Sequence, residues 1–291
     1  MKILVLGSKG QLGQCLNDQL AITEHDVVYT SRGQIDIANF EVTNTQILKI
    51  APDIVINATA YTAVDKAEEE DQTAYYINHL AVANISSICN QLDCWLIHVS
   101  TDYVFNGNSE VPYKEDNPTN PQGVYGVSKL KGEEAIKASG CKYMIIRTAW
   151  VYSEYGNNFL KTMLRLGSDR DELSIVGDQI GCPTYAQDIA KSIVSILSCL
   201  DLKDSSSGTY HYCGDEPCSW YEFARVIFLE AEVQGLKTPN YIKSITTADH
   251  PTPAIRPAYS VLDCSKIESC FDVTRSNWRD GIKTVIPRLQ G

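Results

Sequence analysis

A tyrosine and a lysine lie four residues apart in the stretch VYGVSKL, at Tyr125 and Lys129. Positions i and i+4 of a helix lie one above the other on the same face, so the phenol and the amine can point at one place. A free tyrosine has a pKa of about 10, and a nearby ammonium group lowers it by favouring the phenolate. The pair is therefore predicted to transfer protons, although the same spacing also occurs on helix surfaces without a function.

A glycine-rich turn near the N-terminus is the strongest sign of a bound cofactor. The stretch ILVLGSKGQLGQCL reads as an apolar strand, a glycine turn and the start of a helix. Glycines let backbone amides approach a pyrophosphate, and the first turn of a helix offers unpaired N–H groups. The spacing differs from G-x-G-x-x-G, and a glycine turn without a ligand is the alternative. The predicted cofactor-binding residues of this turn are Gly7, Ser8, Lys9, Gly10, Gln11, Leu12 and Gly13.

The residues after the second predicted strand bear on which nicotinamide cofactor is used. Sites that prefer NAD usually place an acid there for the ribose 2′-hydroxyl, whereas this chain has Ser31 and Arg32. A hydroxyl and a guanidinium suit a 2′-phosphate, so we expect NADPH, with NADH as the alternative. Arg32 could equally be a solvated loop residue. Asp36 and Ile37 complete the cofactor-binding residues predicted in this region.

The third and fourth predicted strands also end in residues suited to a site. Small side chains after the third strand leave room for a flat cofactor to cross the strand ends, at Ala58, Thr59, Ala60, Tyr61 and Thr62. After the fourth strand comes Thr101, whose hydroxyl we expect above the same crevice. Thr101, Tyr125 and Lys129 are therefore predicted to meet where the glycine turn would deliver a nicotinamide ring.

Short apolar runs alternate with helical patterns over the first half of the chain. They predict strands over 2–6, 27–30, 54–57, 95–100 and 143–147, and helices over 11–20, 43–50, 71–91 and 125–139. This alternation indicates an α/β fold with a Rossmann-type doubly wound parallel sheet. We expect a dinucleotide-binding domain over 1–148 and about 186–214, and a smaller, discontinuous C-terminal substrate domain over about 149–185 and 215–291. A solvated turn over 201–208 is expected before one more strand at 209–213.

Taken together, these motifs resemble the extended short-chain dehydrogenase/reductases. More specifically, the chain is similar to the dTDP-4-dehydrorhamnose reductases, through NATAYTAVDKAE, STDYVFNG, YGVSKLKGE, RTAWVYSEYGNNF, QIGCPT and PTPAIRPAYS. These segments extend from Gly7 to Ser260 and so cover nearly the whole chain. The glycine turn, Thr101 and the Tyr125-x-x-x-Lys129 pair are shared across the superfamily, whereas STDYVF and RTAWVY…GNNF are more specific.

The resemblance implies reduction of the 4-keto group of dTDP-4-dehydro-L-rhamnose to dTDP-L-rhamnose, a step in nucleotide-sugar and cell-surface polysaccharide biosynthesis. Tyr125 would protonate the carbonyl oxygen, Thr101 would hydrogen-bond it, and Lys129 would also bind the nicotinamide ribose. Substrate contacts are implied for Thr101, Asp102 and Trp150, and more weakly for Asn157, Asn158 and Arg256. Trp150 could instead be a core aromatic residue, and the two asparagines could cap the helix that begins near Phe159.

Other functions remain open on the sequence alone. Related 4,6-dehydratases follow the equivalent threonine with Asp-Glu, but here Asp102 is followed by Tyr103. The missing glutamate argues against dehydration, and an epimerase stays possible. The alternatives are a reductase of another nucleotide 4-ketohexose and a non-catalytic NADP-binding regulatory subunit of the same fold.

The composition narrows the partners and the compartment. A formal net charge of −11 and a pI near 4.9 make nucleic acid an improbable partner. The apolar N-terminal run is too short for a signal peptide or a membrane span, so we expect a cytoplasmic protein. The ten cysteines lack metal-ligand spacing and are interpreted as reduced, mostly buried thiols.

The histidines and acidic residues give no sign of a metal site. All five histidines are scattered and are interpreted as structural. Some members of the resembled family join two subunits through magnesium bound by acids near the first helix and the C-terminus. Cys15 and the acid-free tail KTVIPRLQG make that magnesium doubtful here, so we predict no metal and a monomer or weak homodimer.

Overall fold

A six-stranded parallel sheet forms the centre of the computed structural model, which describes residues 1–199 and 206–290. The strands lie in the order β10-β5-β4-β3-β1-β2, and every neighbouring pair is parallel. Their bounds are β1 Lys2–Leu6, β2 Asp26–Thr30, β3 Ile54–Asn57, β4 Trp95–Thr101, β5 Lys142–Thr148 and β10 Gly208–His211. The predicted Rossmann-type α/β fold is confirmed, while most of the expected turn over 201–208 lies outside the described residues.

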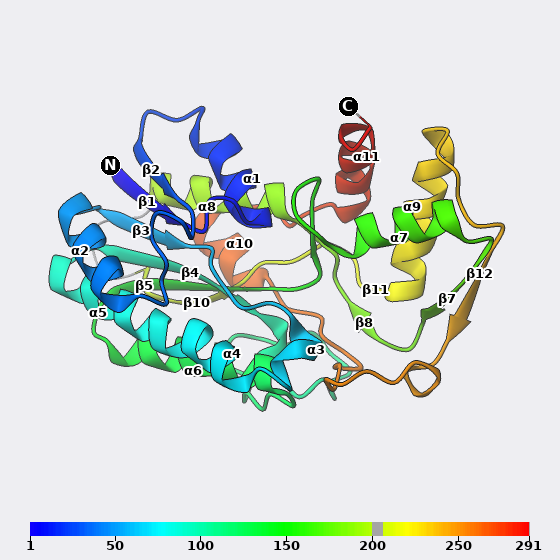
Figure 1. Cartoon of the computed structure of the whole chain (residues 1–291), viewed down its shortest axis with the longest axis horizontal. Helices are drawn as coiled ribbons and strands as arrows, with labels where there is room; N and C mark the ends of the chain where they lie inside the picture. The colour runs from blue at the N-terminus through cyan, green and yellow to red at the C-terminus, as the bar shows by residue number, and fades with distance from the viewer. Residues whose placement is uncertain (200–205, 291) are drawn as a thin grey trace.

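Helices cover both faces of the sheet, as Figure 1 shows. One face packs against α1 Gln11–Leu20, α8 Ala186–Cys199 and α10 Ser265–Phe271. The other packs against α2 Phe40–Ile50, α5 Ala81–Leu92 and α6 Val124–Ala138. The strands carry apolar side chains on both faces because each face is buried, which is typical of parallel sheets.

The segment predicted as one long helix over 71–91 is divided in the structure. It contains α4 Asp71–Tyr75, the π-helical turn η1 Tyr76–Leu80 and α5. Asn78 lies in the π-helical turn, and its side chain bonds the backbone of Tyr61 through Oδ1 at 2.8 Å and Nδ2 at 3.0 Å. The extra residue in this turn therefore coincides with a polar contact to the loop after β3.

A second group of elements packs beside the sheet, on the right of Figure 1. Its own hydrophobic cluster includes Phe223, Trp278 and Ile282. Its elements are β6 Val151–Tyr152, α7 Phe159–Asp169, β7 Glu172–Val176, β8 Ile180–Gly181, β9 Thr184–Tyr185, β11 Cys218–Ser219, α9 Trp220–Val233, β12 Tyr241–Ile245, η4 Thr247–Asp249 and α11 Trp278–Arg288. The proposed domain division stays a prediction; within its second part, Ile267 and Phe271 of α10 belong to the cluster under the sheet.

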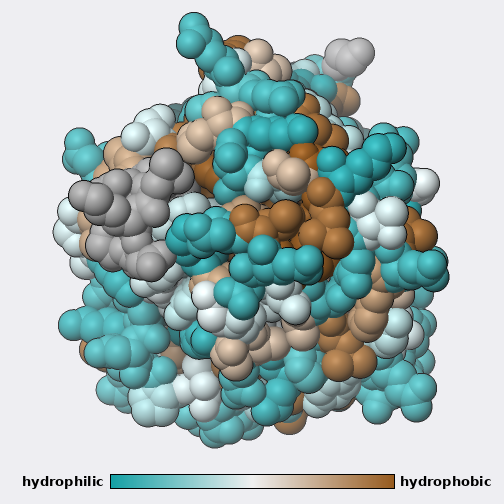
Figure 2. All heavy atoms as spheres, turned by 90° about the vertical axis from the view of Figure 1, so that its left-hand side faces the viewer, coloured by the Kyte–Doolittle hydropathy of each residue, from teal (hydrophilic) through white to brown (hydrophobic). Residues whose placement is uncertain are grey.

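The loops that follow β1, β3, β4 and β5 all lie at the carboxyl edge of the sheet, facing the second group. The strand order reverses between β1 and β3, which is where ligands bind in open α/β sheets. Two short helices follow these strands: α3 Val64–Ala67 after β3 and η2 Asp102–Val104 after β4. The opposite end of the molecule, seen in Figure 2, is mainly hydrophilic with apolar side chains in small groups.

Candidate active site

A cavity of about 580 Å³ opens at this carboxyl edge and brings together most of the predicted site residues. The three predicted catalytic residues line it together with residues from the glycine turn and the loop after β3. Those predicted residues that line it are Gly10, Gln11, Leu12, Ala58, Thr59, Ala60, Thr62, Thr101, Asp102, Tyr125, Lys129, Trp150 and Asn157.

The glycine turn has the geometry that a dinucleotide pyrophosphate requires. Gly7 has a φ of +83°, and a Cβ at this position would lie 2.9 Å from the Thr59 side chain. A Cβ on Gly13 would lie 2.1 Å from the Gly7 carbonyl oxygen, so only glycine lets α1 pack this closely against the turn. The N–H groups of Gly7 and Ser8 both donate to the Thr30 carbonyl. The donors left for a ligand are those at the start of α1, whose N-cap Gly10 supplies no side-chain acceptor.

Other predicted cofactor-binding residues lie outside this cavity. The Arg32 side chain is 85% exposed, with its Nε 3.3 Å from an Asp36 carboxylate oxygen. The Ser31 hydroxyl donates to Gln34 at 3.0 Å, and Ile37 is buried in the cluster between the sheet and helices α2, α5 and α6. The remaining members of the predicted set that do not line the cavity are Gly7, Ser8, Lys9, Gly13 and Tyr61.

The electrostatic relation between Tyr125 and Lys129 differs from our expectation. Burial raises the pKa of Tyr125 well above its ordinary value, with a smaller opposing effect from a Thr101 hydrogen bond. The Lys129 amine lies 3.1 Å from His98 Nε2 and donates to the Val99 carbonyl at 2.7 Å. Burial also lowers the pKa of Lys129 to about 8. The expectation of a lowered tyrosine pKa is therefore wrong for this structure, in which the phenol keeps its proton at neutral pH.

Thr101 is held by the residues that follow it. Its hydroxyl donates to Asp102 Oδ1 at 2.9 Å and accepts the Tyr103 N–H at 3.2 Å. Asp102 is buried, and its Oδ2 has no hydrogen-bond partner among the described residues. Burial raises the pKa of Asp102 to about 6. The site thus contains a carboxyl group that lines the cavity, with one oxygen bonded to Thr101 and the other buried.

Trp150 lies at the boundary between the sheet and the second group of elements. Its ring stacks on Trp220, with centroids 3.5 Å apart and planes 7° from parallel. Gly181 makes room for the indole, because a Cβ there would lie 2.4 Å from the ring. Trp150 has a φ of +48°, a conformation that a bulky residue rarely adopts. Trp220 was missed by sequence reasoning, since nothing around it differs from an ordinary helix start.

Asn158 has the capping role that we considered as an alternative. Its Oδ1 accepts the Lys161 N–H at 3.1 Å and so caps α7. Its Nδ2 donates to Gln11 Oε1 at 2.7 Å, while Gln11 Nε2 donates to the Val151 carbonyl at 3.2 Å. The glycine turn is thus tied to the loop that leads into α7.

A second cavity of about 940 Å³ lies next to the first. The two share the residues Thr62, Val64, Tyr103 and Val151 in their walls. Arg256 lines the second cavity and pairs with Asp65 of α3 at 2.7 Å. Arg256, the predicted diphosphate ligand, therefore lines a different cavity from Tyr125. The Asp65 carboxylate partly neutralises its charge.

Buried polar residues beneath the first cavity were not predicted as part of the site. Glu133 of α6 accepts from the Arg147 guanidinium at 2.9 and 2.7 Å and from the Ser100 hydroxyl at 2.6 Å. His98 joins Asn57 to Lys129. A histidine inside the apolar strand WLIHVST is the signal that could have identified this contact, since such a side chain must find polar partners.

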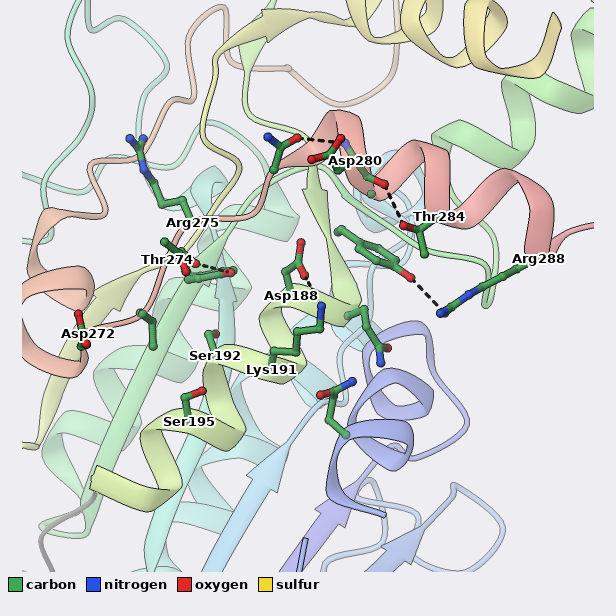
Figure 3. A pocket seen from close by; sticks show the side chains of 17 residues that line it. Asp188, Lys191, Ser192, Ser195, Asp272, Thr274, Arg275, Asp280, Thr284 and Arg288 are labelled. Carbon is green, nitrogen blue, oxygen red and sulfur yellow. Dashed lines mark hydrogen bonds and ion pairs between the residues drawn. The ribbon is translucent and has the colours of Figure 1, made fainter. Parts of the chain in front are cut away.

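A further cavity, of about 570 Å³, lies between α8 and α11 and contains none of the predicted site residues (Figure 3). Its charged groups are largely paired: Lys191 lies 3.2 Å from Asp188, and Arg288 pairs with Glu154. Over residues 1–199 and 206–290, no group of three or more His, Cys, Asp or Glu side chains is arranged to hold a metal ion. The exclusion of magnesium stays a prediction. In the same ranges, no helix has the length and apolar character needed to cross a membrane.

The fold and the side chains at the carboxyl edge define an NAD(P)-dependent oxidoreductase of the short-chain dehydrogenase/reductase class. Comparison with known proteins places it more narrowly. Residues 1–290 match the family model of the RmlD substrate binding domain, so the chain belongs to this family, as the sequence motifs predict.

Relatives and solved structures of this family match over the whole chain. The dTDP-4-dehydrorhamnose reductase of Aggregatibacter actinomycetemcomitans is 41% identical over 288 residues, covering 98% of each chain. The enzyme of the same name from Escherichia coli strain K12 is 38% identical over 297 residues, covering 99% of this chain and 98% of its own. The crystal structure of the Bacillus anthracis reductase in complex with NADP has a TM-score of 0.91 at 35% identity and covers 99% of both chains.

Proposed function

We propose that this chain reduces the 4-keto group of dTDP-4-dehydro-L-rhamnose to the hydroxyl of dTDP-L-rhamnose, with NADPH as the reductant. The observation that carries the proposal is the convergence of Thr101, Tyr125 and Lys129 on one cavity with the glycine turn. The names of the full-length relatives support this substrate. The name of a Bacillus subtilis relative, a spore coat polysaccharide biosynthesis protein that is 39% identical, agrees with a role in polysaccharide biosynthesis.

The residues present fit a dinucleotide. The uncapped start of α1 would bind the diphosphate, the small residues 58–60 would face the nicotinamide half, and Lys129 would bind its ribose. Arg32 is largely exposed and pairs with Asp36 only at the surface, so its guanidinium would turn to a 2′-phosphate; NADP in the Bacillus anthracis structure supports the same preference. When bound, the reduced nicotinamide supplies a hydride from its C4 atom.

The chain's own groups would supply the proton and hold the ketone. Tyr125 carries its proton at neutral pH and would donate it to the carbonyl oxygen as the hydride arrives. Thr101 would hydrogen-bond the same oxygen after its hydroxyl turns away from Asp102 Oδ1. Asp102 lines the same cavity, and its carboxylate would accept a hydrogen bond from a sugar hydroxyl.

The second cavity would take the nucleotide end of the substrate. The two cavities are adjacent, and the substrate would extend from the first into the second. Arg256 is suited to a diphosphate because its planar guanidinium binds two oxygens at once. We further propose a monomer or weak homodimer in the cytoplasm; a reducing compartment suits the ten free cysteines.

One coupled assay tests the proposal. The purified chain is mixed with dTDP-4-dehydro-L-rhamnose and either NADPH or NADH, and loss of reduced-nicotinamide absorbance is followed. We expect rapid oxidation that depends on the sugar and is faster with NADPH. A second ketosugar nucleotide, with a different base or stereochemistry, serves as the control. Turnover of only the control would indicate another ketohexose reductase, and nicotinamide binding without any turnover would indicate a regulatory subunit.

A further inference from the structure

Trp150 occupies a position where the backbone favours glycine. Its φ of +48° lies in the left-handed region, which glycine adopts freely and a bulky residue rarely does. The chain turns here from β5 of the sheet into β6 of the second group of elements. A strained backbone of this kind persists only where surrounding contacts hold it, and such residues cluster at functional sites. The contacts of the indole should therefore explain why a tryptophan is present at this turn.

The indole of Trp150 belongs to the wall of the first cavity. Thr148 is paired with Thr101 in the register of β5 and β4, and Trp150 follows Thr148 by two residues. Tyr125 and Lys129 line the same cavity. An indole is large and rigid, so its position decides how much room the cavity leaves for a sugar.

Two elements of the second group contact this indole. The Trp220 ring stacks on it, with centroids 3.5 Å apart and planes 7° from parallel. A Cβ on Gly181 would lie 2.4 Å from Cε2 and 2.6 Å from Nε1 of the indole, so the backbone of β8 packs closely against the same ring. Cys218 of β11 pairs with Gly181 of β8, and Trp220 follows Cys218 by two residues. The pairing of β8 with β11 therefore brings both contacts to one ring.

Trp220 is itself held by its surroundings. It is the first residue of α9, and the preceding Ser219 forms a capping box with Glu222. The Phe159 ring packs on the Trp220 ring, with centroids 4.6 Å apart. Trp220 lines the second cavity, and Trp150 lines the first. The stack therefore contributes one ring to the wall of each cavity.

We propose that Trp220 is a positioning residue of the active site: its stacking holds the Trp150 indole against Gly181 and so sets the room that the first cavity leaves for the sugar. Without the stack, the strained turn at Trp150 relaxes and the indole leaves its place in the wall. A looser wall binds the preferred ketosugar less tightly and rejects other ketosugars less strongly. The effect on the sugar rests on the proposed function, whereas the position of the indole does not.

Nuclear magnetic resonance of the free protein tests the position of the indole. The chain contains four tryptophans, and with ¹³C,¹⁵N-tryptophan the Trp150 signals are assigned by their loss in Trp150→Phe. We expect the Trp150 ring protons to be shifted upfield by the Trp220 ring and to show strong nuclear Overhauser effects to the Gly181 α-protons. Trp220→Leu should weaken those effects because the indole moves, whereas Trp220→Phe, which keeps an aromatic ring, should retain them. Tyr221→Leu removes an aromatic ring from the next position of α9 and is the control, with the wild-type contacts expected.

Steady-state kinetics with dTDP-4-dehydro-L-rhamnose and a second ketosugar nucleotide test the effect on the sugar. We expect Trp220→Leu to raise the KM for the first substrate about 3- to 10-fold, the range that one aromatic pair is worth, and to lower its preference over the second. The NADPH dissociation constant should stay unchanged, since Trp220 lines the second cavity and the glycine turn lines the first. Trp220→Phe should restore most of the preference. A merely structural defect would instead lower kcat for both substrates alike.

Gly181→Ala tests the same contact from the other element and remains informative if Trp220→Leu does not fold. The added methyl group would lie too close to the indole, so it should displace the ring, reduce the upfield shift from Trp220 and lower the sugar preference. An indole that keeps its full contacts with Gly181 in Trp220→Leu, or a wild-type sugar preference in both variants, would overturn the proposal. If wild type reduces neither ketosugar, the proposed function fails, and the resonance data alone decide whether Trp220 positions Trp150.

Discussion

Replacing Glu133 with glutamine should destabilise the protein and disturb the candidate site at the same time. Glu133 of α6 has no exposed surface, and only 1% of the surface of Arg147, whose guanidinium faces it, is exposed. Ser100, which also donates to Glu133, directly precedes Thr101, and Glu133 follows Lys129 by one helical turn. The ion pair therefore joins the strand that carries Thr101 to the helix that carries Tyr125 and Lys129.

The expected cost follows from the burial of the remaining partner. Glutamine keeps the shape of the side chain but leaves the Arg147 charge buried and without compensation. Removing one member of such a pair costs about 3–5 kcal/mol in free energy of unfolding. Lys137, 3.6 Å from Glu133, is partly exposed and adds little.

The pH dependence has a definite sign. Burial acts to raise the pKa of Glu133, but the Arg147 hydrogen bond and charge outweigh it, so the pKa lies below the ordinary value of 4.5. The stabilisation is thus present above about pH 4.5 and is lost as the pH falls through the lower, folded-state value. The difference between wild type and Glu133→Gln should be full at pH 7 and shrink on acidification.

Urea unfolding followed by tryptophan fluorescence, at pH 7 and in acid, measures this effect. Glu134→Gln is the matched control, because the neighbouring Glu134 forms only an exposed pair with Lys131 at 2.7 Å. We expect Glu134→Gln to lower the free energy of unfolding by less than about 0.5 kcal/mol. If Glu133→Gln loses no more stability than the control at pH 7, the reasoning about this pair is refuted.

Three further changes probe the site itself. Tyr125→Phe should lower turnover by about 10²- to 10⁴-fold, while the NADPH dissociation constant stays unchanged; a wild-type rate would rule out Tyr125 as the proton donor. Asp102→Asn should remove a pH dependence of stability: the pKa of Asp102 is raised from 3.8 to about 6, so wild type loses up to about 3 kcal/mol as the pH rises between these values. Thermal unfolding from pH 4 to 7 checks this, and identical profiles in the two proteins would contradict it. Asp65→Asn should lower the KM for the nucleotide sugar by up to about fivefold, because Arg256 loses a competing carboxylate; steady-state kinetics that show a raised KM would count against Arg256 as a diphosphate ligand.

The sequence predicted the sheet better than the polar contacts beneath it. Runs such as ILVL and IVIN are typical of buried strands, and each agrees closely with an observed strand. By contrast, Asn57 meets His98 only because β3 and β4 are neighbouring strands in which these two residues lie opposite each other. The separation of the two residues along the chain does not reveal that register. The direction of the pKa shift of Tyr125 was mispredicted for a similar reason, since helical spacing shows which side chains share a face but not how deeply they are buried.

The π-helical turn and the stacking of Trp220 on Trp150 could not be predicted from the sequence either. The apolar pattern over 71–91 has helical periodicity throughout, and one extra residue per turn at η1 does not interrupt it. Trp220 reaches Trp150 only because α9 and the end of β5 come together in the folded chain. Contacts between elements distant in sequence decide both features.

The hydrogen bonds of Gln11 have a practical consequence for attempts to redesign specificity. Gln11 belongs to the glycine turn, yet it bonds both Val151 and Asn158, at the two ends of the 151–158 loop. Grafting this loop from another enzyme would therefore remove support from the nucleotide-binding turn as well. Swaps that retain Asn158 should preserve cofactor affinity better than swaps that discard it.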